Sequence, residues 1–236
     1  MDLLATALDM LLPHRCLLCS DPHAESSLCN ACRADLPWLD CACMHCALPL
    51  PEDAELCGRC LTTSPSFDRC RAAFRYTSPI DRLIGQFKNQ RHLGAGKLLS
   101  HLLADEIRLV TDDQGLPELI APVPLHWRRQ LQRGFNQAAF VAEALARELN
   151  IPLVAAAKRC RATPKQQQLN RKQRLRNLDC AFVINEELVR DRQVAIVDDV
   201  VTTGATAEAL GRQLKKAGAR RVEVWALART PAPAAR

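Results

Sequence analysis

Residues 194–227 read VAIVDDVVTTGATAEALGRQLKKAGARRVEVWAL, and the class of fold can be inferred from them. The first four of these residues are apolar, which is typical of a buried strand in a parallel sheet. Apolar residues then recur at helical spacing from Ala207 to Ala217, and Gly218 is a signal for the end of a helix. A second apolar stretch follows at residues 222–226. The pattern therefore predicts a strand–helix–strand unit of a parallel α/β sheet.

Two carboxylates and a threonine–glycine loop lie between the predicted strand and the predicted helix. Asp198 and Asp199 follow Val197, and residues 202–206 read TTGAT. Ligands of open α/β sheets bind outside the carboxyl ends of the strands, and backbone N–H groups at a helix start favour an anion. Gly204 lets the backbone approach closely. The loop therefore suits a phosphate monoester, and the carboxylates suit ribose hydroxyls, directly or through Mg²⁺. The alternative is a plain turn that the aspartates only cap.

Eight of the twelve cysteines form four C-x-x-C pairs near the start of the chain. They are Cys16, Cys19, Cys29, Cys32, Cys43, Cys46, Cys57 and Cys60. Two such pairs complete a tetrahedral shell of four thiolates around Zn²⁺, and so short a segment cannot bury much core without a metal. The spacing predicts two structural zinc sites, paired in sequence order. Crossed pairing and iron in place of zinc are the alternatives. We expect the remaining cysteines, Cys41, Cys70, Cys160 and Cys180, to be ordinary thiols.

Charge is divided unevenly along the chain. Residues 1–60 carry three basic and nine acidic residues, while the whole chain has a net charge of +6. A negative cysteine-rich segment argues against contact with phosphates, so we expect a folding or docking element rather than a nucleic-acid reader. A polyanion should instead meet the basic remainder. Aromatic residues make up only 4% of the chain, which excludes an extended base-stacking surface.

The N-terminal residues do not read as a targeting segment. They contain two acidic residues and no basic residue before His14, whereas a secretory signal begins with positive charge. Their leucines fit one face of a short helix. No apolar run approaches the roughly 20 residues of a membrane span. We expect a cytoplasmic protein without membrane insertion, in which cysteines stay reduced.

These motifs resemble a known family. Residues 194–206 resemble the signature that binds 5-phosphoribosyl-1-pyrophosphate (PRPP) in type I phosphoribosyltransferases. Together with the cysteine pairs, residues 83–94, 126–137 and 163–177 resemble the ComF/GntX family of competence-associated proteins, which is linked to natural DNA uptake. The resemblance implies an α/β fold of the type I phosphoribosyltransferase kind, with a Rossmann-like parallel sheet and a small N-terminal zinc-ribbon domain. We expect a double zinc ribbon at 1–66, a phosphoribosyltransferase-like domain at 67–230 and a frayed tail at 231–236.

The resemblance also assigns roles to residues. It implies that Asp198 and Asp199 hold the ribose hydroxyls of PRPP and that Thr202 to Thr206 hold its 5′-phosphate. The complete PRPP-binding set is Asp198, Asp199, Val200, Val201, Thr202, Thr203, Gly204, Ala205 and Thr206. The loop after a predicted strand at Leu119–Val123 corresponds to the pyrophosphate loop. Its candidate donors are Arg128, Arg129 and Arg133, with Gly134 permitting close approach; a solvated basic loop is the alternative.

A dense basic run lies between Lys158 and Arg176, where eight residues are basic and none is acidic. In the resembled fold this is a flexible hood that closes over the substrate, and Lys165 and Arg174 are its candidate ligand-binding residues. Such a run is equally a track for single-stranded DNA or a solvated loop. The sequence does not choose between hood and track, which can be one surface.

Two functions follow from the resemblance. The first is a protein that binds PRPP or another ribose phosphate and handles incoming single-stranded DNA in natural competence, with DNA-uptake proteins as partners. The alternative is an active phosphoribosyltransferase with an unknown acceptor. Purine-salvage relatives place an aspartate where this chain has Thr202, so an acceptor of that kind loses support. Orotate and adenine relatives also lack this aspartate, so its absence does not exclude turnover. The sequence assigns no catalytic residue and does not decide whether the chain is an enzyme.

Overall fold

The computed structural model describes residues 15–22, 27–51, 54–109, 115–125, 134–159 and 182–232. In chain order its elements are α2 (Asn30–Ala34), α3 (Gly58–Thr62), β1 (Arg69–Arg75), α4 (Ile80–Gln90), α5 (Leu93–Leu109), β2 (Leu119–Pro122), α7 (Gln137–Leu149), β3 (Ala157–Arg159), β4 (Phe182–Ile184), α9 (Glu186–Val189), β5 (Gln193–Val201), α10 (Ala205–Lys216) and β6 (Arg221–Arg229).

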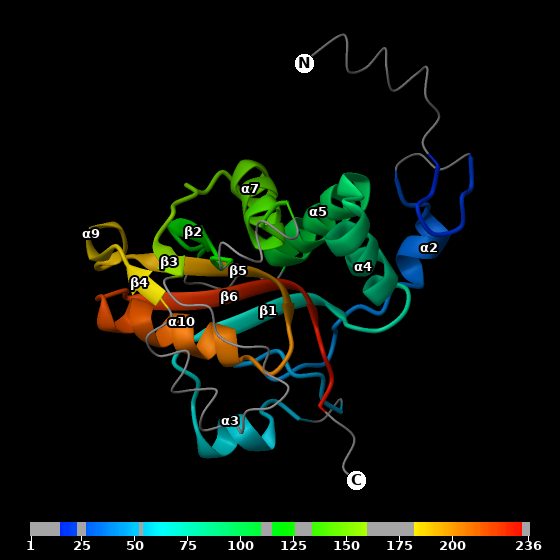
Figure 1. Ribbon diagram of the computed structural model, residues 1–236. Coiled ribbons are helices and arrows are strands. Elements are labelled where there is room, and N and C mark those ends of the chain that lie inside the picture. Colours follow the sequence, from blue (N-terminus) through cyan, green and yellow to red (C-terminus); the bar gives the residue numbers. More distant parts are fainter. Residues whose placement is uncertain are drawn as a thin grey trace.

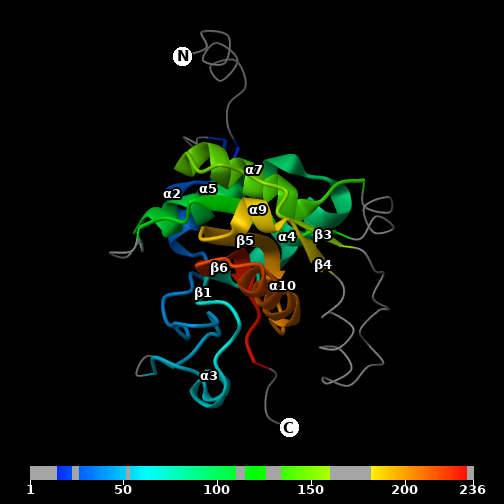
Figure 2. The ribbon, with the colours of Figure 1, turned by 90° about the vertical axis from the view of Figure 1, so that its left-hand side faces the viewer.

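A four-stranded parallel sheet forms the centre of the molecule. Its strand order is β1-β6-β5-β2, and every neighbouring pair is parallel. Helices α4, α5 and α7 cover one face and α10 covers the other, as Figures 1 and 2 show from two directions. The apolar side chains divide into two clusters, one on each side of the sheet. The predicted parallel α/β sheet is confirmed, and β5, α10 and β6 are the predicted strand–helix–strand unit.

Strand β5 extends further than the sequence predicted. The expected strand ended at Val197, with both aspartates beyond it. In the structure β5 continues to Val201 because β6 runs beside it, and Asp198 pairs with Ala226. The acidic pair therefore lies inside a strand, whose hydrogen bonds fix its backbone.

The cysteine-rich segment packs on both faces of the sheet. Cys16 and Leu28 belong to the apolar cluster of α4 and α5, whereas Cys43 and the other three cysteines of the last two C-x-x-C pairs belong to the cluster of α10. Between these halves, Trp38 forms an antiparallel bridge with Phe74 of β1. This contact covers part of an edge that would otherwise present unpaired backbone groups. Figure 1 shows α2 beside α4 and α3 on the opposite side of the sheet.

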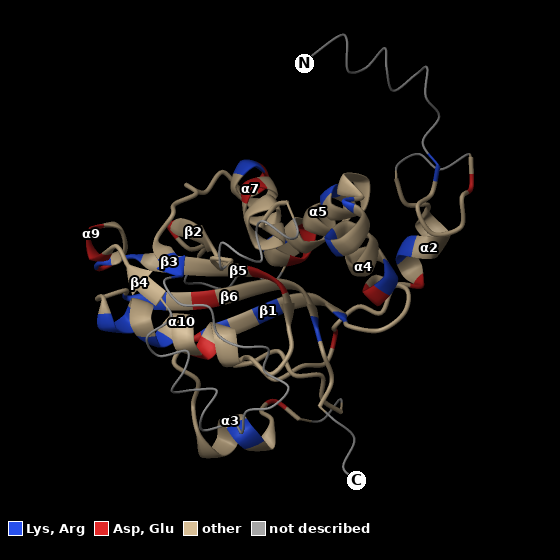
Figure 3. Ribbon diagram, in the orientation of Figure 1, with Lys and Arg blue, Asp and Glu red and all other residues tan. Residues whose placement is uncertain are grey.

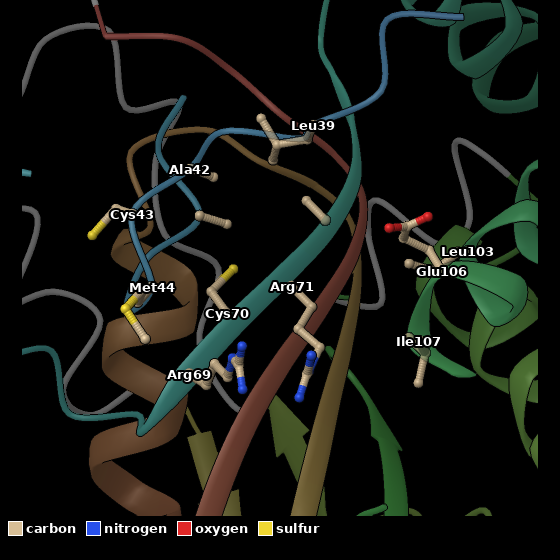
Figure 4. A pocket seen from close by; sticks show the side chains of 12 residues that line it. Leu39, Ala42, Cys43, Met44, Arg69, Cys70, Arg71, Leu103, Glu106 and Ile107 are labelled. Carbon is tan, nitrogen blue, oxygen red and sulfur yellow. The ribbon is translucent and has the colours of Figure 1, made fainter. Parts of the chain in front are cut away.

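A cavity of about 160 Å³ lies where the cysteine-rich segment meets β1 and α5. Figure 4 shows Met44 of that segment facing β1, with Glu106 of α5 across the strand. Arg71 of β1 lines the cavity and its Nε lies 3.4 Å from the Glu223 carboxylate. The cavity is thus a gap at the junction of two packed parts, away from the carboxyl ends of the strands.

Several predictions fall outside the described residues. They concern Arg128, Arg129 and Arg133 of the expected pyrophosphate loop, Lys165 and Arg174 of the basic run, and the leucines of the first fourteen residues. The division of the chain at residue 66 stays a prediction, as does the frayed tail. Among the helices that the structure describes, none is both long and apolar enough to cross a membrane.

Candidate functional site

A cavity of about 270 Å³ opens at the carboxyl edge of the sheet. Its walls come from the ends of β1, β2 and β5, from the first turns of α7 and α10, from the end of α4, and from β3. This is the edge where ligands bind in open α/β sheets. Both predicted aspartates line the cavity, together with Thr202 and Thr206 of the predicted loop.

Residues 202–206, called here the Thr-Gly loop, form a turn that leads into α10. Gly204 is the N-cap of α10 with φ 75°, in the left-handed region that favours glycine. An added Cβ at Gly204 would meet no heavy atom within 4 Å, so open space lies beside it. A small cavity of about 40 Å³ adjoins the loop. The first N–H groups of α10 and the positive end of its dipole make this space favourable for an anion.

The acidic pair is held by local hydrogen bonds and by a cation. Asp198 Oδ1 accepts from the backbone N–H of Asp199 at 2.9 Å, and Asp199 Oδ1 accepts from Val200 N at 2.6 Å. Lys88 Nζ lies 2.9 Å from Asp199 Oδ2. Burial, together with the negative charge of Asp199, raises the pKa of Asp198 to about 7. Near neutral pH the pair is therefore only partly ionised.

Two cations at the end of α4 were missed by the sequence analysis. Lys88 lines the cavity and pairs with Asp199. Arg91, the C-cap of α4, lies over Gly134, where an added Cβ would be 2.0 Å from Arg91 Nη2. Gly134 thus permits the close approach of an arginine. In the sequence, Lys88 and Arg91 belong to the stretch 83–94 that resembles the family. No local pattern indicates that Lys88 contacts Asp199 or that Arg91 lies over Gly134.

The start of α7 was missed as well. Asn136 is its N-cap: Oδ1 accepts from Ala138 N at 3.0 Å, and Nδ2 donates to Val123 O at 3.1 Å. Gln137 is buried and lines the cavity. A second helix N-terminus therefore faces the same space as α10, which adds to the fixed positive potential there. An Asx cap followed by an apolar helix was a readable signal for this element.

The basic run begins beside the cavity. Lys158 and Arg159 lie on β3, which pairs with β4 in antiparallel fashion, and Arg159 lines the cavity. Its guanidinium carbon lies 5.5 Å from the ring centre of Phe182 on β4. Residues 160–181, which hold the rest of the run, connect these two strands and lie outside the described part of the chain. The start of the run thus lies next to the candidate site.

The eight paired cysteines form two clusters, grouped in sequence order. The first cysteine cluster is Cys16, Cys19, Cys29 and Cys32, and the second cysteine cluster is Cys43, Cys46, Cys57 and Cys60. Sulfur atoms of neighbouring pairs are 3.7 Å apart in the first cluster and 3.6 Å apart in the second. Four thiolates at a Zn–S distance of about 2.3 Å have sulfur atoms about 3.8 Å apart, whereas a disulfide needs about 2.05 Å. The donor set therefore fits Zn²⁺.

Backbone hydrogen bonds lower the pKa of one thiol in each cluster, Cys16 in the first and Cys43 in the second. Burial alone would raise the pKa of Cys43, but the N–H groups of Cys57, Cys46 and His45 bring it down to about 7. By contrast, burial raises the pKa of Cys70 to about 12. Cys41 and Cys70 lie outside both clusters, so neither is placed as a metal ligand.

Comparison with known proteins agrees with this architecture. A family model described as double zinc ribbon domain matches residues 7–61, and one described as phosphoribosyl transferase domain matches residues 136–236. Competence protein F of Haemophilus influenzae is 37% identical over 222 residues, which cover 91% of this chain and 96% of that protein. The chain belongs to the Competence protein F (ComF) family.

Other relatives of this ComF-family chain align over similar lengths. DNA utilization protein YhgH of Escherichia coli K12 is 37% identical over 226 residues, 94% of this chain and 99% of that protein. Competence protein ComFC of Bacillus subtilis is 24% identical over 86% of this chain and 89% of that protein. The structure of a purine phosphoribosyltransferase from Pyrococcus horikoshii aligns with a TM-score of 0.37 and 21% identity, covering 60% of this chain and 77% of that one. The predicted fold class, a type I phosphoribosyltransferase-like sheet behind a double zinc ribbon, is confirmed.

Proposed function

We propose that this ComF-family chain binds PRPP, or a closely related ribose phosphate, together with Mg²⁺ at the carboxyl edge of its sheet. We propose further that it takes part in natural competence and in the handling of incoming single-stranded DNA. The observation that carries the first proposal is two adjoining cavities, which share Asp198, Thr202 and Thr206 and together extend from the acidic pair of β5 to the open turn at Gly204.

Each part of the cavity suits one part of PRPP. The Thr-Gly loop offers N–H and hydroxyl donors to the 5′-phosphate at the start of α10. Asp198 and Asp199 offer acceptors to the two ribose hydroxyls, and a bound Mg²⁺ would neutralise charge between the carboxylates, the sugar and the pyrophosphate. Lys88 and the start of α7 lie on the side left for the pyrophosphate. In this proposal Arg128, Arg129, Arg133, Lys165 and Arg174 keep their predicted roles as further pyrophosphate or hood contacts.

The proposed role with DNA is supported by relatives and by charge. The relatives carry the names Competence protein F and DNA utilization protein YhgH and align over nearly their whole length. The chain has a net charge of +6 although its first 60 residues are acidic, which supports attraction of a polyanion to the phosphoribosyltransferase-like part. DNA-uptake proteins as partners and a cytoplasmic location belong to the same proposal, since thiolate–metal clusters fit a reducing compartment.

Thermal unfolding with PRPP and MgCl₂ tests the site. We expect saturating PRPP to raise the Tm, because a ligand at about 100 times its Kd adds about 2.7 kcal/mol to the free energy of unfolding. Asp199→Asn should lose most of this shift, because it removes a charged acceptor and leaves Lys88 without its carboxylate. Asp81→Asn, which changes a carboxylate in the first turn of α4, should keep the shift. Equal shifts in Asp199→Asn and the unchanged protein would contradict the assignment.

Pyrophosphate release separates the two functions of the site. A binding protein leaves PRPP intact, whereas a transferase releases pyrophosphate when an acceptor is present. The exposed side chain of Thr202 lines the cavity where purine-salvage enzymes use an aspartate, so we expect no release with purine bases other than adenine, whose transferases also lack that aspartate. Release with any base of a panel would favour the transferase.

A further inference from the structure

A buried arginine connects the Thr-Gly loop to the second cysteine cluster. Arg229, the last residue of β6, is only 5% exposed. Its Nε donates to the carbonyl of Cys46 at 3.0 Å. Its Nη1 donates to the carbonyl of Val201 at 3.1 Å and also to the carbonyl of Thr202. One guanidinium thus joins a cluster cysteine to the backbone at the start of the loop.

A second arginine comes from the cluster itself. Arg59 lies between Cys57 and Cys60 on α3, and its Nη1 donates to the carbonyl of Thr203 at 3.1 Å. The residue is exposed, so this hydrogen bond lies at the surface. The second cysteine cluster is therefore linked to two consecutive carbonyls of the loop. The buried Arg229 binds the carbonyl of Thr202, and the exposed Arg59 binds that of Thr203.

The segment after the cluster holds the first turn of α10. Ser66 donates to Glu208 twice, from its N–H at 2.9 Å and from its hydroxyl at 2.6 Å. Glu208 is 7% exposed; burial alone would raise its pKa, but the bonds from Ser66 and the pairing with Arg212 lower it. The start of α10 is thereby fixed from the same side as the loop.

These contacts have a directional consequence for the loop. In a planar trans peptide, the carbonyl of one residue and the N–H of the next point in opposite directions. Fixing the carbonyls of residues 201–203 on the arginines therefore turns the N–H groups of Thr202, Thr203 and Gly204 to the other side of the loop. Those N–H groups are the donors that an anion beside Gly204 would use.

We propose that Arg59 and Arg229 are positioning residues for the Thr-Gly loop, and that the second cysteine cluster is thereby a structural part of the anion-binding site. The identity of the anion rests on the proposed function, but the orientation of the loop does not. The cluster contributes the carbonyl of Cys46 and the turn that presents Arg59. Neither arginine is placed in contact with the ligand.

The first cysteine cluster supplies a matched control. Arg33, next to Cys32, is also an exposed arginine that reaches the α/β part: its Nη2 lies 3.1 Å from Asp105 Oδ2 on α5. Arg33→Ala and Arg59→Ala thus remove the same side chain and a contact of the same length, at different places on the sheet. Only Arg59→Ala should affect the loop.

Amide NMR spectra of the full-length, zinc-loaded protein test this without any ligand. We expect the amide signals of Thr202, Thr203 and Gly204 to move in Arg59→Ala, because the carbonyl of Thr203 loses its donor, and to stay in place in Arg33→Ala. Arg229→Lys keeps the charge but not the planar fork, so its effect should be larger. Zinc content by elemental analysis establishes that both clusters remain loaded. The Kd for PRPP with MgCl₂ should rise about two- to tenfold in Arg59→Ala, as for the loss of one hydrogen bond.

The outcomes separate this inference from the proposed function. Amide signals of residues 202–204 that stay in place in both Arg59→Ala and Arg229→Lys would overturn the positioning roles. Equal movement of these signals in Arg33→Ala would overturn them too, because the effect would then not depend on the contacts of the second cysteine cluster. If the loop responds as expected but the unchanged protein binds no PRPP, the proposed ligand is wrong and the positioning roles stand.

Discussion

The acidic pair shows how single residues in this site balance charge. Asp198 and Asp199 stand side by side at the end of a buried strand, and Lys88 supplies one positive charge at 2.9 Å from Asp199. One carboxylate is therefore neutralised by the lysine, while the other lies in surroundings that disfavour a second negative charge. A cation brought in with the ligand would relieve this imbalance, which is consistent with a site built for a metal-bound phosphate ester.

Because of this charge imbalance, the free energy of unfolding should depend on pH. The pKa of Asp198 is about 7 in the folded state against an ordinary value of 3.8, so between these values the folded state binds more protons than the unfolded state. The protonated Asp198 carboxyl therefore contributes fully to the free energy of unfolding below about pH 4, and this contribution is lost as the pH rises through 7. We expect Asp198→Asn to raise the free energy of unfolding by about 2 to 4 kcal/mol at pH 8 and by much less at pH 5.

Urea unfolding of both proteins from pH 5 to pH 8, without ligand, measures this difference. Asn keeps the oxygen that accepts from Asp199 N, so the local backbone should be unchanged. A difference that stays constant across the pH range would contradict a raised pKa for Asp198.

Residues were predictable where their partners are near in sequence. Asp198, Asp199 and Gly204 could be found because strand, carboxylates and helix start follow one another within one short stretch. Lys88 and Arg229 could not, since each acts on a group far along the chain. Arg229 reads in the sequence as the ordinary charged end of a strand, and its burial against four carbonyls appears only in the fold.

Continuous apolar patterns predicted that a strand or helix is present. They did not predict the residues at which it begins and ends. Strand β1 begins at Arg69, ahead of its apolar residues Ala72, Ala73 and Phe74. Two arginines made its first residues look polar, yet Arg71 is buried beside Glu223. The paired strands β3 and β4 are only three residues long each, too short for an apolar pattern to give their bounds. Pairing with a neighbouring strand, which no local pattern contains, decides where these strands start and stop.

Two helical glycines test the packing of α4 against α5. Gly96 of α5 is buried, and an added Cβ there would lie 2.5 Å from a ring carbon of Phe87 on α4. Gly85 of α4 would meet no heavy atom within 4 Å. We expect Gly96→Ala to lower the free energy of unfolding by about 1 to 3 kcal/mol, and Gly85→Ala to raise it by up to about 1 kcal/mol through helix propensity.

Urea unfolding of the two variants compares the same substitution in neighbouring helices. Because Ala favours a helix equally at both positions, the difference between the variants reports the close approach of the two helices. A Gly96→Ala protein as stable as Gly85→Ala would mean that Phe87 moves aside without cost.

At the scale of the whole molecule, the cysteine-rich segment is less separate than its composition suggested. Its two clusters pack into the apolar clusters on opposite faces of the sheet, and the residues between them pair with the edge of β1. The sequence predicted the metal sites from spacing alone, since four thiols need only local turns. Where those sites would lie depends on long-range contacts such as Arg229 to Cys46.

Charge is also organised at this scale. Figure 3 shows acidic positions within β5 and basic positions at the end of α10, on different parts of the molecule. The basic run starts at Lys158 and Arg159, next to the cavity. If the hood and the DNA track are one surface, single-stranded DNA should compete with PRPP for it. The affinity for single-stranded DNA should then depend on the basic residues of the run.

Salt dependence of single-stranded DNA binding is the decisive measurement for that surface. Replacing Arg171, Lys172 and Arg174 together by Ala removes three charges from the run, and replacing Arg190, Arg192 and Arg220 by Ala removes three exposed charges paired with Glu186 and Glu118. Since each phosphate contact adds about 0.7 to the slope of log K against log salt for single strands, the first variant should lose about 2 from that slope. The second should lose much less, because net charge alone does not release counterions from contacted phosphates. Equal slopes in both variants would place the DNA elsewhere, or nowhere, on this chain.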